Sequence, residues 1–228
     1  MCLGLPSFAG GGIFSKDASS VWSLAGKAGG LRSPDGVSRI IVEQSTDQKA
    51  DWPLLVRATR KGKSFSTHFE RFVSAGAEVA WAPDSSAFFV TYSDGGAIGT
   101  YHVLIYQVDD SGLHSYEPIP NGRKLFAPHC FDPEVPNVGA IRWGSSASTI
   151  IISVEVPPHS SCASMGTFRA FEVTLPEARV VRQYNQLEAK KLLWPSLGVE
   201  LRNADDSCIR KPATCVPPGL DPSPARSR

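Results

Sequence analysis

Hydrophobic and polar residues alternate with a period of two over much of this chain, the pattern of strands with one face buried. The pattern is clearest at residues 78–108, EVAWAPDSSAFFVTYSDGGAIGTYHVLIYQV. There Val79 and Trp81 alternate with Glu78 and Ala80, and Pro83-Asp84 begins a turn. We expect three strands in one meander. The last of them, residues 101–108, is apolar at both parities, which predicts a strand covered on both faces.

Similar stretches elsewhere predict a mainly β chain. Further strands are expected at residues 38–44, 52–60, 64–72, 113–120, 123–126, 140–143, 148–156, 167–174 and 179–184. Ile150-Ile151-Ile152 has the composition of a strand buried on both faces. Residues 15–32 are polar and rich in glycine, and their pattern fits either a short helix or a first edge strand.

One helix is predicted near the C-terminus, at residues 186–193 (QLEAKKLL). Its residues are good helix formers, and Asn185 stands where an N-cap side chain is favoured. Trp194-Pro195 would end it, because a residue before proline avoids the helical region. We expect its Leu187/Lys191 side to lie opposite the side of Leu192 and Leu193.

A repeat organises these strands. VAWAPDSSAFFV (79–90) aligns without a gap on IRWGSSASTIII (141–152), which places Trp143 under Trp81. Ser33-Pro34-Asp35-Gly36 aligns with residues 82–85 in the same way. The spacings of 49 and 62 residues are close to the roughly 40–50 residues of a propeller blade, with room for loop insertions.

A tryptophan and a Pro-Asp turn before an aromatic or aliphatic strand resemble the repeat of WD40-like β-propellers, above all the periplasmic variety associated with the Tol system. The resemblance covers about residues 30–185 and implies a propeller-like fold of repeated antiparallel meanders, with about three blades.

The chain also departs from the propeller repeat. Arg32 replaces the tryptophan in the first copy, the third copy lacks Pro-Asp, and no Trp-Asp dipeptide occurs. A closed ring typically needs at least about four blades. Either degenerate flanking segments supply a fourth blade, or the β structure is open and sandwich-like. Trp81 and Trp143 are expected to pack in the core rather than stack on a ligand.

Composition favours an ordinary globular β protein. The chain has 228 residues, of which 42% are hydrophobic and 20% charged, enough for one substantial core. Lysine and arginine number 23 against 22 acidic residues, so no strong field recruits nucleic acid. No apolar run approaches the roughly 18 residues of a membrane-spanning helix.

The N-terminal sequence MCLGLPSFAGGG predicts export. Ser7 and Ala9 are small residues at the −3 and −1 positions of a cleavage site before Gly10. A flexible glycine-rich terminus is the alternative. We therefore divide the chain into a truncated signal peptide (1–9), an N-terminal segment (10–32), a repeated β domain (33–185), a C-terminal helix with a disulfide loop (186–215) and a disordered tail (216–228). The predicted location is the periplasm or the exterior.

The cysteines support the same interpretation. Four of them remain after Cys2 is removed with the signal peptide, and an even set in an exported chain predicts disulfides. We pair Cys208 with Cys215, which close a short loop, and Cys130 with Cys162. A zinc site is the competing interpretation, with His129, Cys130, His159 and Cys162 as ligands. No other metal and no cofactor is predicted.

No catalytic constellation is recognisable. The chain lacks a Gly-x-Ser-x-Gly elbow, and His102 lies within an apolar strand, where a surface or hydrogen-bonded core role is expected. Our leading hypothesis is an exported, propeller-like binding protein whose partner is another protein or a small extracellular ligand. The alternatives are a cleft hydrolase, with its site on loops 94–99, 128–136 and 157–165, and a zinc-stabilised scaffold.

Overall fold

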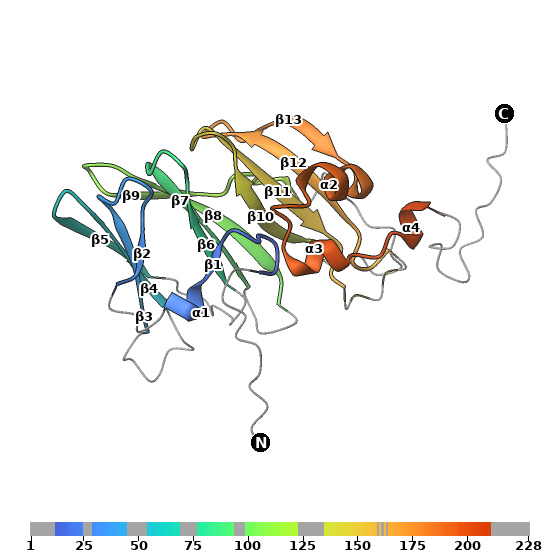
Figure 1. Ribbon diagram of the computed structural model, residues 1–228, viewed down its shortest axis with the longest axis horizontal. Helices are drawn as coiled ribbons and strands as arrows, with labels where there is room; N and C mark the ends of the chain where they lie inside the picture. The colour runs from blue at the N-terminus through green and yellow to red at the C-terminus, as the bar shows by residue number, and fades with distance from the viewer. Residues whose placement is uncertain are drawn as a thin grey trace, which may run out of the picture.

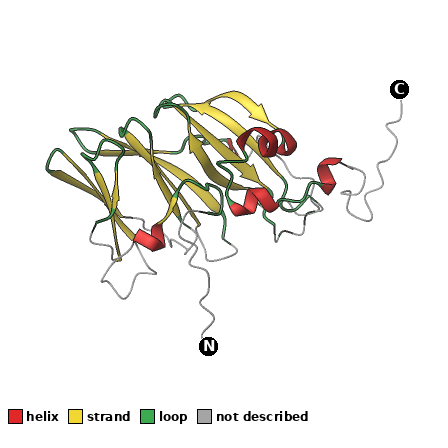
Figure 2. Ribbon diagram, in the orientation of Figure 1, coloured by secondary structure: helices red, strands yellow, loops and turns green. Residues whose placement is uncertain are grey.

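The computed structural model describes residues 12–24, 29–44, 54–68, 77–93, 99–122, 135–158, 160, 162 and 164–210. They form three antiparallel sheets and a few short helices, which confirms the mainly β class (Figure 1). The helices gather at one end of the molecule, apart from one short helix near the N-terminus (Figure 2). None of the described helices is long and apolar enough to cross a membrane.

Each sheet contains a four-stranded meander. The first has the order β2 (Leu31–Arg32), β3 (Arg39–Gln44), β4 (Leu54–Arg60) and β5 (Lys63–His68). The second has β6 (Glu78–Trp81), β7 (Ala87–Ser93), β8 (Tyr101–Val108) and β9 (Leu113–Tyr116), with β1 (Ser19–Ser20) added beside β6. The third has β10 (Asn137–Trp143), β11 (Thr149–Glu155), β12 (Phe168–Thr174) and β13 (Arg179–Tyr184).

The sheets pack on one another through their buried faces. Ile40 and Val56 of the first sheet share a core with Phe88 of the second. Phe89, on the opposite face of the same strand, shares another core with Ile152 of the third sheet. The second sheet is therefore covered on both sides, as the apolar pattern of residues 101–108 predicted.

The two tryptophans of the repeat make the same contact at both interfaces. Trp81 Nε1 donates to the carbonyl oxygen of Leu31 at 3.1 Å, and Trp143 Nε1 donates to that of Ala80, also at 3.1 Å. Leu31 and Ala80 are themselves equivalent in the sequence repeat. Both indoles are buried, at 8% and 6% exposure, so they pack in the core as expected. The sequence repeat thus corresponds to a repeated contact between sheets.

The two ends of the stack differ from its internal interfaces. Beyond the third sheet, α2 (Gln186–Leu193) and α3 (Val199–Asn203) cover the face that carries Ile151 and Phe168; residues 186–204 are called the helical cap below. The far face of the first sheet carries Arg39, Ile41, Arg57 and Thr59, which are paired in register and only half-buried. One end is covered by helices, and the described side chains of the other end are mostly polar.

The predicted C-terminal helix is confirmed, but its buried face is not the expected one. Asn185 caps α2 through a capping box with Glu188. Its buried residues are Gln186, Ala189 and Leu193, whereas Leu192 is 52% exposed. Expecting Leu192 and Leu193 on one side was wrong, because consecutive helical residues lie about 100° apart.

Other local predictions need correction. Two further short helices, α3 and α4 (Ser207–Arg210), follow α2, where only a loop was expected. The polar stretch of residues 15–32 contains both a strand, β1, and a helix, α1 (Val21–Leu24). The strand predicted to reach Pro120 ends at Tyr116, because Pro118 and Pro120 have no N–H for the ladder. The strand predicted at residues 123–126 lies outside the described residues.

The tryptophan contacts give a direct prediction. Trp81→Phe and Trp143→Phe should each lower the free energy of unfolding by about 2 kcal/mol, because each loses an interface hydrogen bond and leaves a void. Trp194→Phe is the matched control, since Trp194 is 48% exposed and should change the free energy of unfolding little. Urea denaturation of the three variants measures this. Equal effects at all three positions would contradict the proposed role of the repeat.

Candidate functional site

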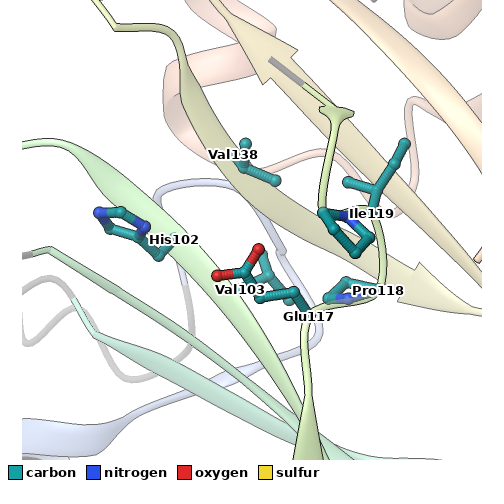
Figure 3. Close-up of a pocket in the computed structure, with 7 residues that line it drawn as sticks. His102, Val103, Glu117, Pro118, Ile119 and Val138 are labelled. Atoms are coloured by element: carbon teal, nitrogen blue, oxygen red, sulfur yellow. The ribbon is translucent and has the colours of Figure 1, made fainter. Parts of the chain in front are cut away.

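A small hollow lies between β8, the loop after β9 and β10. Its lining includes His102, Glu117, Ile119 and Val138, and the Glu117 carboxylate points toward the His102 ring (Figure 3). The His102 ring also stacks on Tyr92, with the ring centroids 5.4 Å apart. The volume of about 30 Å³ accommodates a water molecule or two but not an organic ligand.

The predicted zinc ligands fall mostly outside the described part of the chain. Of the four, only Cys162 is described, and it is buried with 2% exposure. Among the described residues, no three metal-ligating side chains gather. Cys130 and Cys215 also lie outside, so both disulfide pairings stay predictions. The hydrolase loops are described only in part, at residues 99, 135–136, 157–158, 160, 162 and 164–165.

Glu78, the first residue of β6, is the most elaborately bonded carboxylate in the described structure. Its Oε1 accepts the backbone N–H groups of Gly12 and Ile13, both at 2.6 Å. Its Oε2 accepts those of Phe14 and Ser15, at 3.1 and 3.3 Å. Residues 12–16 are called the inserted segment below. Although the alternation pattern suggested a half-buried strand, with Glu78 at a polar position, this side chain is 1% exposed.

The inserted segment joins Glu78 to the helical cap. The N–H of Gly198 donates to the Phe14 carbonyl at 2.8 Å, and that of Glu200 donates to the Ile13 carbonyl at 3.1 Å. The ring of Phe14 is fully buried beside Gly139, where an added Cβ would lie 2.1 Å from a ring atom. Gly139 thus makes room for the phenyl ring, and the segment connects the second sheet, the third sheet and the cap.

A second buried carboxylate lies at the end of β11. Glu155 is 1% exposed, and its Oε2 accepts the side-chain N–H of Asn137 at 3.3 Å. Asn137 in turn accepts the backbone N–H of Tyr101 at 3.1 Å, so the pair links the second and third sheets. The other oxygen of Glu155 has no hydrogen-bond partner among the described residues.

Burial changes the acidity of both carboxyl groups. It raises the pKa of Glu78 from 4.5 to about 7, against the opposing effect of four backbone N–H donors. Burial, together with the negative charge of Glu200, raises the pKa of Glu155 from 4.5 to about 8. Only one N–H group, from Asn137, stabilises the charged form of Glu155 and so opposes the rise in its pKa. Glu155 therefore fits its site best as a neutral acid. Sequence reasoning missed both residues, since a single glutamate in a strand has no distinguishing signal.

The largest concentration of exposed apolar side chains lies at the C-terminal end of the described chain. Nine large hydrophobic residues are exposed among the described residues, and six of them fall between residues 180 and 199. They belong to β13, to α2 and its C-cap Trp194, and to the first residue of α3, and of these elements α2 packs against β13 (Figure 1). The term C-terminal surface is used below for the exposed parts of residues 180–199. Val180 lies on the face of the third sheet opposite α2, whereas Leu187, Leu192, Trp194 and Val199 belong to the helical cap; Val181 lies at the edge of the sheet.

Trp194 is held in place at this surface. The guanidinium of Arg202 lies 5.3 Å from the Trp194 ring centroid and also donates to the Trp194 carbonyl at 3.1 Å. The indole is therefore positioned by neighbouring groups while about half of it stays exposed. Rigid tryptophan and arginine side chains are enriched among the residues that dominate protein interfaces.

Comparison of the chain with protein-family models, with curated proteins and with solved structures finds no match in any of the three.

The raised pKa of Glu155 predicts how stability changes with pH. Its folded-state pKa lies above the unfolded value, so the folded state binds the extra proton and loses stability as pH rises from about 4.5 to 8. The loss is at most roughly 1.4 kcal/mol per pH unit. Glu155→Gln mimics the neutral acid, so it should match the wild type at about pH 4.5, and its advantage in stability should grow from there to about pH 8.

Urea denaturation across this pH range tests the sign. Glu177→Gln, at an exposed position outside the hollow, is the control and should follow the wild type throughout. Because Glu78 contributes in the same direction, part of the pH dependence should survive in Glu155→Gln. A Glu155→Gln protein less stable than the wild type at every pH would show that Glu155 folds as a carboxylate.

Proposed function

We propose that the protein is an exported interaction module in which three propeller-like blades form an open stack and present the C-terminal surface to a partner protein. The observation that carries this proposal is that six of the nine large hydrophobic side chains exposed in the described part of the chain belong to residues 180–199. Scattered exposed apolar residues are normal, whereas clustered ones mark interaction sites.

The blade interpretation is supported by the repeated architecture. All three sheets have the same up-and-down order, and β7 and β11 are separated by 62 residues, as are Trp81 and Trp143. The neighbouring turns are also linked at both interfaces. Asp35 N donates to Ser85 Oγ at 3.0 Å, and Ala147 N donates to Asp84 Oδ2 at 2.8 Å. Repeats that contact only their neighbours in this way build quasi-linear arrays.

An open stack is favoured over a closed ring by its two ends. In a ring, the outer faces of the first and third sheets would pack on each other or on a further blade. Here the helical cap covers the outer face of the third sheet. In the first sheet, Arg32 stands at the position of Trp81 and Trp143, so this sheet lacks the indole that would donate a hydrogen bond to a preceding blade. Repeat arrays commonly have terminal units whose outer faces are polar or otherwise capped.

Export is supported by the cleavage-like sequence before Gly10 and by the cysteines. Neither Cys162 nor Cys208 is free in this structure. The predicted pairings, Cys130–Cys162 and Cys208–Cys215, would tie loops to the third sheet and to the end of the helical cap. Such bridges persist in an oxidising compartment.

The binding role can be tested with a photo-cross-linking residue. Benzoylphenylalanine in place of Trp194, in cells that express the full chain, should give discrete adducts heavier than the protein itself. The same residue in place of Val37 is the control, because Val37 is 54% exposed but lies in the turn between β2 and β3, away from the C-terminal surface. Leu192→Glu should remove the adducts at position 194. Equal labelling at both positions, or no adduct at 194, would refute the proposal.

A further inference from the structure

The edge strand β13 is unusually open. Five consecutive residues, from Arg179 to Gln183, are exposed, and only Tyr184 at the end of the strand is buried. The last strands of the other two meanders, β5 and β9, contact each other. Among the described strands, β13 pairs only with β12, so its outer side presents a row of backbone N–H and C=O groups.

The side chains of β13 alternate between basic and apolar character. Arg179 is paired with Thr174 and Arg182 with Glu172, so both arginines lie on the face of the sheet that also carries Tyr184. Val180, paired with Val173, lies on the other face and is 37% exposed. Val181 is the extra residue at a register shift in the pairing and is 46% exposed.

The charges indicate which partner this edge accepts. Arginines on an edge strand oppose pairing with an identical edge, because a two-fold pairing of β13 with itself would bring four arginines together. The strand contains no acidic residue, and the guanidinium of Arg182 is held 4.5 Å from the centroid of the Tyr184 ring. On the inner side of the strand, Glu172 is paired with Arg182 and faces part of this charge, whereas Arg179 is paired with Thr174, which carries none. A strand with glutamate or aspartate on its arginine-facing side would supply negative charge from the outer side, where the described residues of β13 offer none.

The apolar neighbours extend the same site. Val180 and Val181 are exposed at this edge, whereas α2 packs against β12 and β13 on the face that carries the arginines. An added strand could therefore bond its backbone to β13 and lay apolar side chains against Val180 and Val181. A lipid surface could use the arginines and valines but would leave the row of backbone groups without partners.

We propose that β13 binds an extended, acidic segment of a partner protein as an added strand of the third sheet. This inference rests on the proposed function and names the site and the chemistry of its partner. Backbone pairing would supply affinity, while the arginines and valines would select alternating acidic and apolar side chains.

A synthetic peptide that alternates glutamate and valine, carrying a fluorescent label, provides the test with the full-length protein. Fluorescence anisotropy should show saturable binding that weakens as salt is raised. The peptide N-methylated at alternate residues should not bind, because it cannot pair its backbone, and the lysine-valine peptide should not bind either. Hydrogen exchange at the β13 amides should slow when the glutamate peptide is added.

Protein variants separate this site from general electrostatics. The double variant Arg179→Glu/Arg182→Glu should weaken binding about tenfold or more, equivalent to about 1.4 kcal/mol. The matched control is Arg32→Glu/Lys63→Glu, which reverses two exposed basic residues on the first sheet and should leave binding unchanged. Equal losses in both variants, or equal binding of the N-methylated peptide, would overturn the proposal.

Two further outcomes would also overturn it. Binding to phosphatidylserine vesicles that depends on Arg179 and Arg182, without binding of the peptide, would assign the surface to a membrane. A dimer in solution that is lost on Val181→Asp would assign the edge to a second copy of the chain.

The two proposals can fail separately. If the peptide fails to bind while benzoylphenylalanine at position 194 still cross-links to a partner, the interaction module stands and only the β13 site is wrong. If both fail, the proposed function fails as well.

Discussion

The carboxylate of Glu78 is the contact through which the separate parts of this structure are joined. It lies at the start of the central sheet and receives four consecutive backbone N–H groups from residues 12–15. The N–H groups of Phe14 and Ser15 would otherwise be buried without partners, which costs about 1–3 kcal/mol each. Because the same residues bond through their carbonyls to the helical cap, one glutamate side chain links two regions that are far apart in the sequence.

The stack of sheets and the cap depend on this link in different ways. The two sheet interfaces have their own apolar cores and tryptophan hydrogen bonds, so they hold without the inserted segment. The cap, in contrast, packs on the third sheet partly through Phe14, which belongs to the inserted segment. Gly198 in the cap allows the close approach, since an added Cβ would lie 2.2 Å from the Ile13 carbonyl oxygen. The C-terminal surface therefore rests on a cap whose position the N-terminal residues help to fix.

Much of the stack could be predicted from the sequence, because its signals are periodic. Alternation located most strands, and the alignment of Trp81 with Trp143 predicted a shared role that the structure bears out as one repeated hydrogen bond. The inserted segment could not be predicted, since its bonds use backbone N–H groups that leave no trace in residue type. Glu78 and Glu155 look like ordinary polar positions of their strands, and only tertiary packing buries them. The short helix α3 was missed because five residues are too few to show a period.

Hydrogen exchange in an N-terminally truncated chain tests the central role of this link most directly. The chain that starts at Gly10 is compared with one that starts at Asp17, which lacks the four N–H donors to Glu78. We expect the amides of Gly198, Val199 and Glu200 to lose protection after truncation, together with α2, while β7 and β8 keep theirs. Unchanged protection throughout the helical cap would show that the inserted segment does not hold the cap in place, and the linking role of Glu78 would be wrong.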